Sequence, residues 1–131
     1  MNNWTFVVRR VRNKPNFFKG DRVSSALFKD AKGVSVNRDD DRELTNIILD
    51  EERLHYCYLE EPKKETKEFK LKALVAVERE VIKVKEVLVV DAPLEENPHH
   101  AVLKKSETEI RLTDSQARAL AMNSRFIKRY D

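Results

Sequence analysis

The sequence predicts a single α+β domain with a mostly antiparallel sheet and two principal helices packed on one face of it. Apolar side chains alternate with lysines over residues 69–72 and are continuous over 73–77, the pattern of a half-buried strand that becomes fully buried. The connection over residues 78–85 is too short for a standard crossover helix, which favours antiparallel neighbours. A chain of 131 residues buries roughly two thirds of the surface that its unfolded form exposes, so one core over residues 1–131 needs no disulfide or metal.

The first forty residues predict a strand followed by a hairpin. Residues 4–11 are rich in β-branched and aromatic side chains, which favour strands. Residues 22–28 and 34–37 flank a turn-forming cluster at 30–33 that ends in glycine. We therefore expect these two segments to pair with each other as a hairpin.

A helix is predicted over about residues 41–54. Its apolar residues follow a helical spacing, and Asp39, Asp40 and Asp41 stand before them. Negative charges stabilise the positive end of the helix dipole, so this position explains the three acids.

The middle of the chain predicts a loop and two buried strands. Residues 60–68 are polar and contain a proline, so they are predicted to form a long surface loop. The strand over residues 69–77 follows, then a short helical turn over 78–85. A second buried strand over 87–90 is expected to lie antiparallel beside the first.

The C-terminal third predicts a short strand and the second principal helix. A turn over residues 97–100 opens a strand over 101–103. Thr113 and Gln116 have the spacing of a capping box, which predicts a helix over about 114–129.

Composition excludes several classes of protein. Two glycines are too few for a P-loop or a dinucleotide-binding turn. Cys57 is the only cysteine, so no internal disulfide can form. No apolar run approaches the roughly 18 residues that a membrane span requires, and the N-terminal residues lack the pattern of a signal peptide. These features predict a cytoplasmic protein that does not contact membranes.

Positive charge gathers at the two ends of the sequence. Residues 1–40 contain nine basic and four acidic side chains, and residues 99–131 contain seven and four. If the ends meet in space, they form a basic face that attracts phosphate, nucleic acid or an acidic protein surface. The alternative is that these charges only keep the protein soluble.

Arg22 and its neighbouring serines are the first candidate binding group. A guanidinium beside the hydroxyls of Ser24 and Ser25 could hold an anion. In the predicted strand, these two serines point to opposite faces. The alternative is that the serines hydrogen-bond to the nearby backbone while Arg22 is solvated.

His99 and His100 are the second candidate group. They follow Pro98 in a stiff turn, and the pKa of histidine lies near neutrality, which suits a general acid or base. Adjacent residues of a strand point to opposite faces, so at most one of the two joins a given site. The alternative is a structural histidine bonded to a backbone carbonyl.

The sequence predicts no metal site and no cofactor. His55 and Cys57 share a face only if their segment is extended, and there is no second cysteine. The three consecutive aspartates lack the spacing and the glycine of a calcium loop.

Nucleic acid is a further possible partner. Basic residues interleave with Phe17 and Phe18 in the N-terminal part, a mixture that suits single strands. The modest excess of positive charge makes this partner less favoured than a small anionic molecule. The basic residues concerned are Arg9, Arg10, Arg12, Lys14, Lys19 and Arg22.

Several short motifs together resemble those of a family of small uncharacterised bacterial proteins. The family pattern has an Arg-x-Ser-x-x-Phe segment, a Ser-Val segment and an Asn-Pro-x-His-Ala segment. These resemble Arg22-Val23-Ser24-Ser25-Ala26-Leu27-Phe28, which has one residue more than the pattern before its phenylalanine, Ser35-Val36, and Asn97-Pro98-His99-His100-Ala101. The resemblance implies that His100, rather than His99, is the motif histidine, and that Ser35 joins the set. Asn37 stands where the family has an aspartate.

The resemblance implies a pocket for a polar ligand, built from Arg22, Ser24, Ser35 and His100. The leading hypothesis is a domain that binds a phosphate-bearing small molecule or nucleotide. A second hypothesis is an enzyme of phosphoester or acyl transfer in which His100 acts as general acid or base. A third is an accessory subunit of a larger bacterial assembly whose basic face binds an acidic protein.

Overall fold

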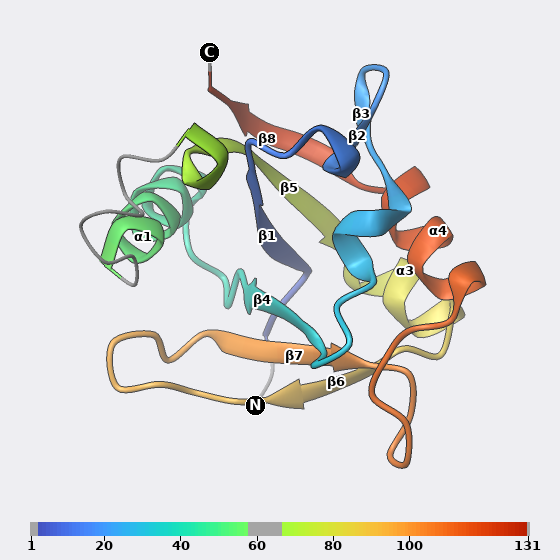
Figure 1. Cartoon of the computed structure of the whole chain (residues 1–131). Helices are drawn as coiled ribbons and strands as arrows, with labels where there is room; N and C mark the ends of the chain where they lie inside the picture. Colours follow the sequence, from blue (N-terminus) through green and yellow to red (C-terminus); the bar gives the residue numbers. More distant parts are fainter. Residues whose placement is uncertain (1–2, 58–66, 131) are drawn as a thin grey trace.

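The fold is centred on one antiparallel sheet of six strands, in the order β6-β7-β4-β1-β5-β8 (Figure 1). The computed structural model describes residues 3–57 and 67–130. The strands of the sheet are β1 (Phe6–Arg12), β4 (Val34–Arg38), β5 (Leu71–Glu78), β6 (Leu88–Asp91), β7 (His100–Lys104) and β8 (Arg125–Arg129). This architecture confirms the predicted α+β class with a mostly antiparallel sheet.

Helices cover both faces of the sheet. They are α1 (Leu44–Cys57), α3 (Arg79–Val84) and α4 (Asp114–Met122), with short 3-10 helices η1 (Pro15–Phe17), η2 (Ser25–Phe28) and η3 (Lys67–Phe69). Leu120 of α4 packs in one core with Val7, whereas Ile47 of α1 packs in another with Val8. Val7 and Val8 point to opposite faces of β1, so the prediction that both principal helices pack on one face was wrong. Figure 1 shows α1 on one side of the strands, with α3 and α4 on the other.

The predicted N-terminal hairpin was also wrong. Residues 22–28 do not pair with 34–37. Instead β3 (Arg22–Val23) pairs with β2 (Phe18–Lys19), and residues 25–28 form η2. Gly20 has a φ of 65°, which permits the tight turn between β2 and β3. The strand β4 pairs with β1 and β7, which are distant in sequence.

The strand over residues 69–77 and the helical turn after it are observed as β5 and α3. The expected pairing of β5 with β6 is wrong, because three strands separate them in the sheet and their directions are parallel. The helix α3 therefore spans one face as a crossover despite its six residues.

The C-terminal helix is shorter than predicted. The capping box forms, with the Gln116 N–H donating to Thr113 Oγ1 and the Thr113 N–H donating to Gln116 Oε1. The helix then ends at Met122, and the residues that follow form the edge strand β8 instead of continuing it.

The three aspartates before α1 have a different role from the one predicted. The helix begins at Leu44, and its first turn contains no acid. Asp39 Oδ1 instead accepts hydrogen bonds from the N–H groups of Thr5 and Phe6. Asp40 and Asp41 have φ values of 45° and 62°, a bend that carries the chain from β4 to α1. Most of the predicted loop over 60–68 lies outside the described residues, since only 67 and 68 are described.

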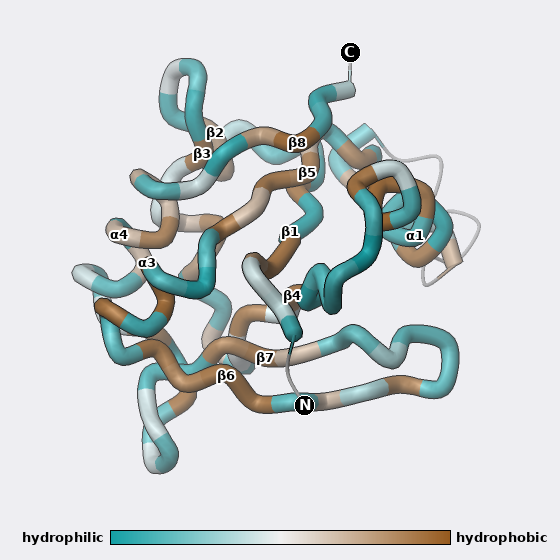
Figure 2. Tube along the Cα trace, turned by 180° about the vertical axis from the view of Figure 1, so that it is seen from behind, coloured by the Kyte–Doolittle hydropathy of each residue, from teal (hydrophilic) through white to brown (hydrophobic). Residues whose placement is uncertain are grey.

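Hydrophobic residues are concentrated in the strands of the sheet, whereas surface turns are hydrophilic. In Figure 2, β6 and much of β5 are brown, whereas the tip of the β2–β3 hairpin is teal. Within residues 3–57 and 67–130, none of the helices has the length and apolar character needed to cross a bilayer.

Candidate functional site

The sheet opens between β1 and β4. The strand β1 pairs with β5 along its whole length, but with β4 only at Val7 and Val8. Beyond these residues β1 and β4 separate. The residues that follow on β1 are three arginines and a valine, so the opening is lined by guanidinium groups.

Arg9 bridges this opening. Its Nε donates to the Leu27 carbonyl at 2.9 Å, and its Nη1 donates to the Ser35 carbonyl at 2.7 Å. These bonds join β1 to η2 and β4, where the backbone ladder is interrupted. Burial lowers the pKa of Arg9 to about 10, so the group is still charged near neutral pH.

A cleft of about 230 Å³ lies in the opening, and we call it the arginine cleft. Its walls are Arg9, Arg10, Arg12, Phe17, Leu27, Ser35 and His55. Arg10 Nε lies 3.9 Å from Glu51 Oε1, while the Arg12 guanidinium lies 5.0 Å from the centre of the Phe69 ring. Among the described residues, no carboxylate lies within 4.0 Å of the guanidinium of Arg9 or Arg12. The cleft is therefore strongly positive.

His55 contributes a neutral side chain to the cleft. Its Nε2 lies 2.6 Å from the Phe69 carbonyl, which accepts only, so this nitrogen carries the proton. Burial lowers the pKa of His55, and Arg10 and Arg12 act in the same direction, although the bond to Phe69 opposes them. His55 and Cys57 lie two residues apart in α1, so the extended segment considered for a metal pair does not exist. In the described part of the chain, no three His, Cys, Asp or Glu side chains are placed to hold a metal ion.

A second, smaller cavity of about 20 Å³ adjoins the cleft, and we call it the inner cavity. Arg10 and Ser35 line both, so the two spaces are neighbours that share part of their walls. The other walls of the inner cavity are Val8, Val36, Asn37, Glu51 and His100.

Buried polar side chains form a chain behind the inner cavity. Asn97 Nδ2 donates to Asn37 Oδ1 at 2.7 Å, and Asn37 Nδ2 donates to Glu51 Oε2 at 2.5 Å. Glu51 is only 1% exposed. Burial raises the pKa of Glu51, although Arg10 and the Asn37 bond act against this. The three side chains connect α1, β4 and the turn before β7.

The two histidines of the Pro98 turn point in different directions. His99 Nδ1 lies 2.7 Å from Asp40 Oδ2, next to an ion pair of Arg38 with the same carboxylate. His100 instead lines the inner cavity, and its Nδ1 donates to the Ala92 carbonyl at 2.8 Å. Of the two, His100 is therefore the one that faces the candidate site.

The structure brings together only part of the predicted pocket. Ser35 and His100 line the same cavity, because β4 and β7 are paired. Arg22 is exposed on β3, opposite Lys19. Among the described residues, the walls of the cleft and of the inner cavity do not include Arg22, Ser24 or Ser25. Figure 1 shows the β2–β3 hairpin at the far end of the molecule from β7.

Ser24 and Ser25 have local roles. The Ser24 hydroxyl donates to the Asn16 carbonyl, and Ser25 begins η2. The segment is not a strand, so the predicted opposite orientation of the two serines does not apply. Phe28, which ends the segment over residues 22–28, is fully buried in the core.

Sequence reasoning missed Glu51 and the assembly of Arg9, Arg10 and Arg12 into a cleft. The arginines were visible only as a basic run with neighbouring phenylalanines. Glu51 gave a weak signal, since it occupies the buried face of α1 together with Ile47 and Leu54. No family model, curated protein or solved structure matches the chain.

Proposed function

We propose that this protein binds a small phosphate-bearing ligand in the arginine cleft. The observation that carries the proposal is that three guanidiniums line one cavity, while Glu51 is the one described carboxylate within 4.0 Å of any residue of this group of arginines; Asp30 acts on Arg9 from a greater distance. Guanidinium groups offer forked donors that match the oxygens of a phosphate. An anion would offset the repulsion among these cations, whereas a neutral ligand would leave it in place.

The dimensions and lining of the cleft favour a small ligand. Its volume of about 230 Å³ lies below the range of about 300 to 1,000 Å³ that is common for drug-sized ligands. Phe17 and Leu27 add an apolar wall beside the charged groups. This combination suits a phosphate attached to a short organic group.

Binding is better supported than catalysis by His100. His100 Nδ1 already donates a hydrogen bond to the Ala92 carbonyl. The ring lines the inner cavity and not the arginine cleft. The cleft itself is dominated by cationic donors, which hold an anion without requiring proton transfer.

The test is a titration of the protein with pyrophosphate, in which NMR chemical shifts and calorimetry measure binding. We expect binding in the wild type that weakens as salt is added, because salt screens the charges. Arg12→Met removes one guanidinium of the cleft and is expected to weaken binding about tenfold, the loss of one charge-assisted hydrogen bond.

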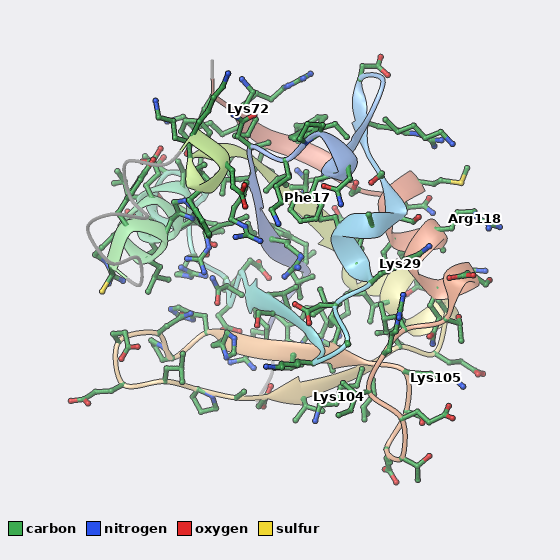
Figure 3. The ribbon with its side chains drawn as sticks, in the orientation of Figure 1. Phe17, Lys29, Lys72, Lys104, Lys105 and Arg118 are labelled. Carbon is green, nitrogen blue, oxygen red and sulfur yellow. The ribbon has the colours of Figure 1, made fainter. Side chains whose placement is uncertain are left out.

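Arg118→Met is the matched control, because it makes the same change at an exposed residue of α4. Figure 3 shows Arg118 pointing outward at the edge of the molecule, whereas Phe17 of the cleft lies near the middle. Equal weakening by both substitutions would mean that net charge alone attracts the anion. That result, or an absence of binding to the wild type, would refute the proposed function.

A further inference from the structure

Two residues that line the inner cavity each have a polar atom that is buried and unpaired. Glu51 Oε1 and Arg10 Nη1 have no hydrogen-bond partner among the residues that the structure describes. A buried polar atom without a partner destabilises the fold, and does so more strongly when its group is charged. Both atoms belong to residues that line this cavity, so a bound group there could satisfy them together.

The carboxylate of Glu51 is held in place from the other side. Its Oε2 accepts from Asn37, which is itself fixed by Asn97. Oε1 is therefore the free acceptor of an otherwise anchored group. The Arg10 guanidinium is close but not bonded, since its Nε is 3.9 Å from Oε1.

The chemistry of the two atoms selects the kind of group that fits. Glu51 Oε1 requires a donor when it is ionised, and Arg10 Nη1 requires an acceptor. An ammonium group only donates and a carbonyl only accepts, whereas a hydroxyl does both. A volume of about 20 Å³ is enough for one such group, because a site for a single water needs about 10 to 15 Å³.

We propose that the inner cavity binds a hydroxyl group of the ligand, which makes the ligand a phosphorylated alcohol such as a sugar or polyol phosphate. The inference rests on the proposed function, because it places the phosphate of the same ligand in the arginine cleft. The hydroxyl then occupies the neighbouring inner cavity, beyond Arg10 and Ser35. The hydroxyl donates to Glu51 Oε1 and accepts from Arg10 Nη1. Arg10 thus contributes to both parts of the site.

The experiment compares two ligands that differ only in their hydroxyls. Terminally phosphorylated glycerol and propyl phosphate have the same carbon chain and the same phosphate. Calorimetry and NMR titration should show that the wild type binds glycerol phosphate about tenfold more tightly or better, since its hydroxyl gains hydrogen bonds to charged groups. This comparison requires no substitution and so does not depend on whether a variant folds.

Glu51→Gln then tests the assigned carboxylate. The glutamine oxygen can still accept from Asn37, which turns its amide donors toward the cavity and removes the acceptor for the hydroxyl. We expect the preference for glycerol phosphate to fall to near one, with pyrophosphate binding retained. Glu52→Gln is the matched control on the next residue of α1, where the carboxylate binds Lys128 and Tyr130 at the surface.

The outcomes separate the two proposals. Equal affinity of the wild type for both alcohol phosphates, with pyrophosphate still bound, would overturn the hydroxyl site and leave the anion cleft standing. A preference that persists in Glu51→Gln would also overturn it. Failure to bind pyrophosphate or either phosphate would overturn the proposed function itself.

Discussion

Replacement of Arg9 tests whether its guanidinium substitutes for the missing backbone ladder between β1 and β4. Arg9→Met keeps most of the apolar stem but removes the bonds to the carbonyls of Leu27 and Ser35. Arg9→Lys keeps the charge, but an ammonium lacks the planar fork that reaches both carbonyls. The two variants therefore separate the contribution of charge from that of geometry.

The expected loss follows from the surroundings of the two carbonyls. Hydrogen bonds to a charged group contribute about 1.5 to 3 kcal/mol each. The bond to Leu27 is partly buried, whereas the one to Ser35 is exposed, so water replaces the second at little cost. We expect Arg9→Met to lower the free energy of unfolding by about 2 kcal/mol and Arg9→Lys by about 1 kcal/mol. For a domain of this size, 2 kcal/mol corresponds to a decrease of about 8 °C in Tm.

Urea denaturation with a fixed m value measures this loss, and Arg12→Met is the control. Arg12 contacts the Phe69 ring, a half-exposed cation–π interaction that contributes about 0.5 to 1 kcal/mol. If Arg9→Met is no more destabilising than Arg12→Met, Arg9 does not hold β4 and η2 to β1, and the reasoning fails.

Three further predictions concern the backbone, a helix cap and a titrating group. Gly33→Ala should destabilise the protein by about 2 to 4 kcal/mol, because φ is 96° and the added Cβ would lie 2.5 Å from Val102 Cγ1. Gly20→Ala, with φ of 65° and no atom within 4 Å, should cost only about 1 kcal/mol, and equal losses in urea denaturation would contradict the clash. Thr113→Ala removes the capping box of α4 and should cost about 1 kcal/mol, whereas Thr113→Ser should cost much less by the same assay. Because the pKa of His55 is lowered in the folded state, the unfolded state binds a proton at a higher pH than the folded state does. The free energy of unfolding should therefore fall as pH decreases below about 6.5. His55→Gln should remove that part of the slope, and an unchanged pH profile of stability would show that the histidine is not shielded from water.

Local patterns predicted the elements whose structure depends on neighbours in sequence. The apolar pattern over residues 69–77 and the spacing of Thr113 and Gln116 are local signals, and both appear as expected in β5 and in the start of α4. The predicted helix over 114–129 was wrong at its end, because residues 125–129 gain hydrogen bonds along the edge of β5. These hydrogen bonds are made with residues about fifty positions away in the sequence, so no local pattern indicates them.

The prediction of the N-terminal hairpin was wrong for a related reason. Two turn signals lie close together, at Gly20 and Gly33, and the pattern alone does not tell which one joins paired strands. The first closes the β2–β3 hairpin, while the chain after the second enters the centre of the sheet. Pairing with distant strands decided between them.

The candidate site was predictable only where motif residues share a pair of strands. Ser35 and His100 were both proposed, and they meet because Asn37 pairs with His100 in the β4–β7 ladder. The arginine cleft depends on the separation of β1 from β4, and that separation has no pattern in either strand. Burial of Glu51 likewise depends on where α1 packs, which the sequence of the helix leaves open.

The short β1–β4 pairing also divides the sheet mechanically. Strands β6, β7 and β4 form one three-stranded half and β1, β5 and β8 the other, and their common ladder is limited to the pairs Val7–Arg38 and Val8–Asn37. A seam of this length resists twisting far less than the long ladder between β1 and β5. Small rotations of one half against the other would therefore change the width of the opening, and a ligand bound between the arginines of β1 and Ser35 of β4 would oppose such rotations.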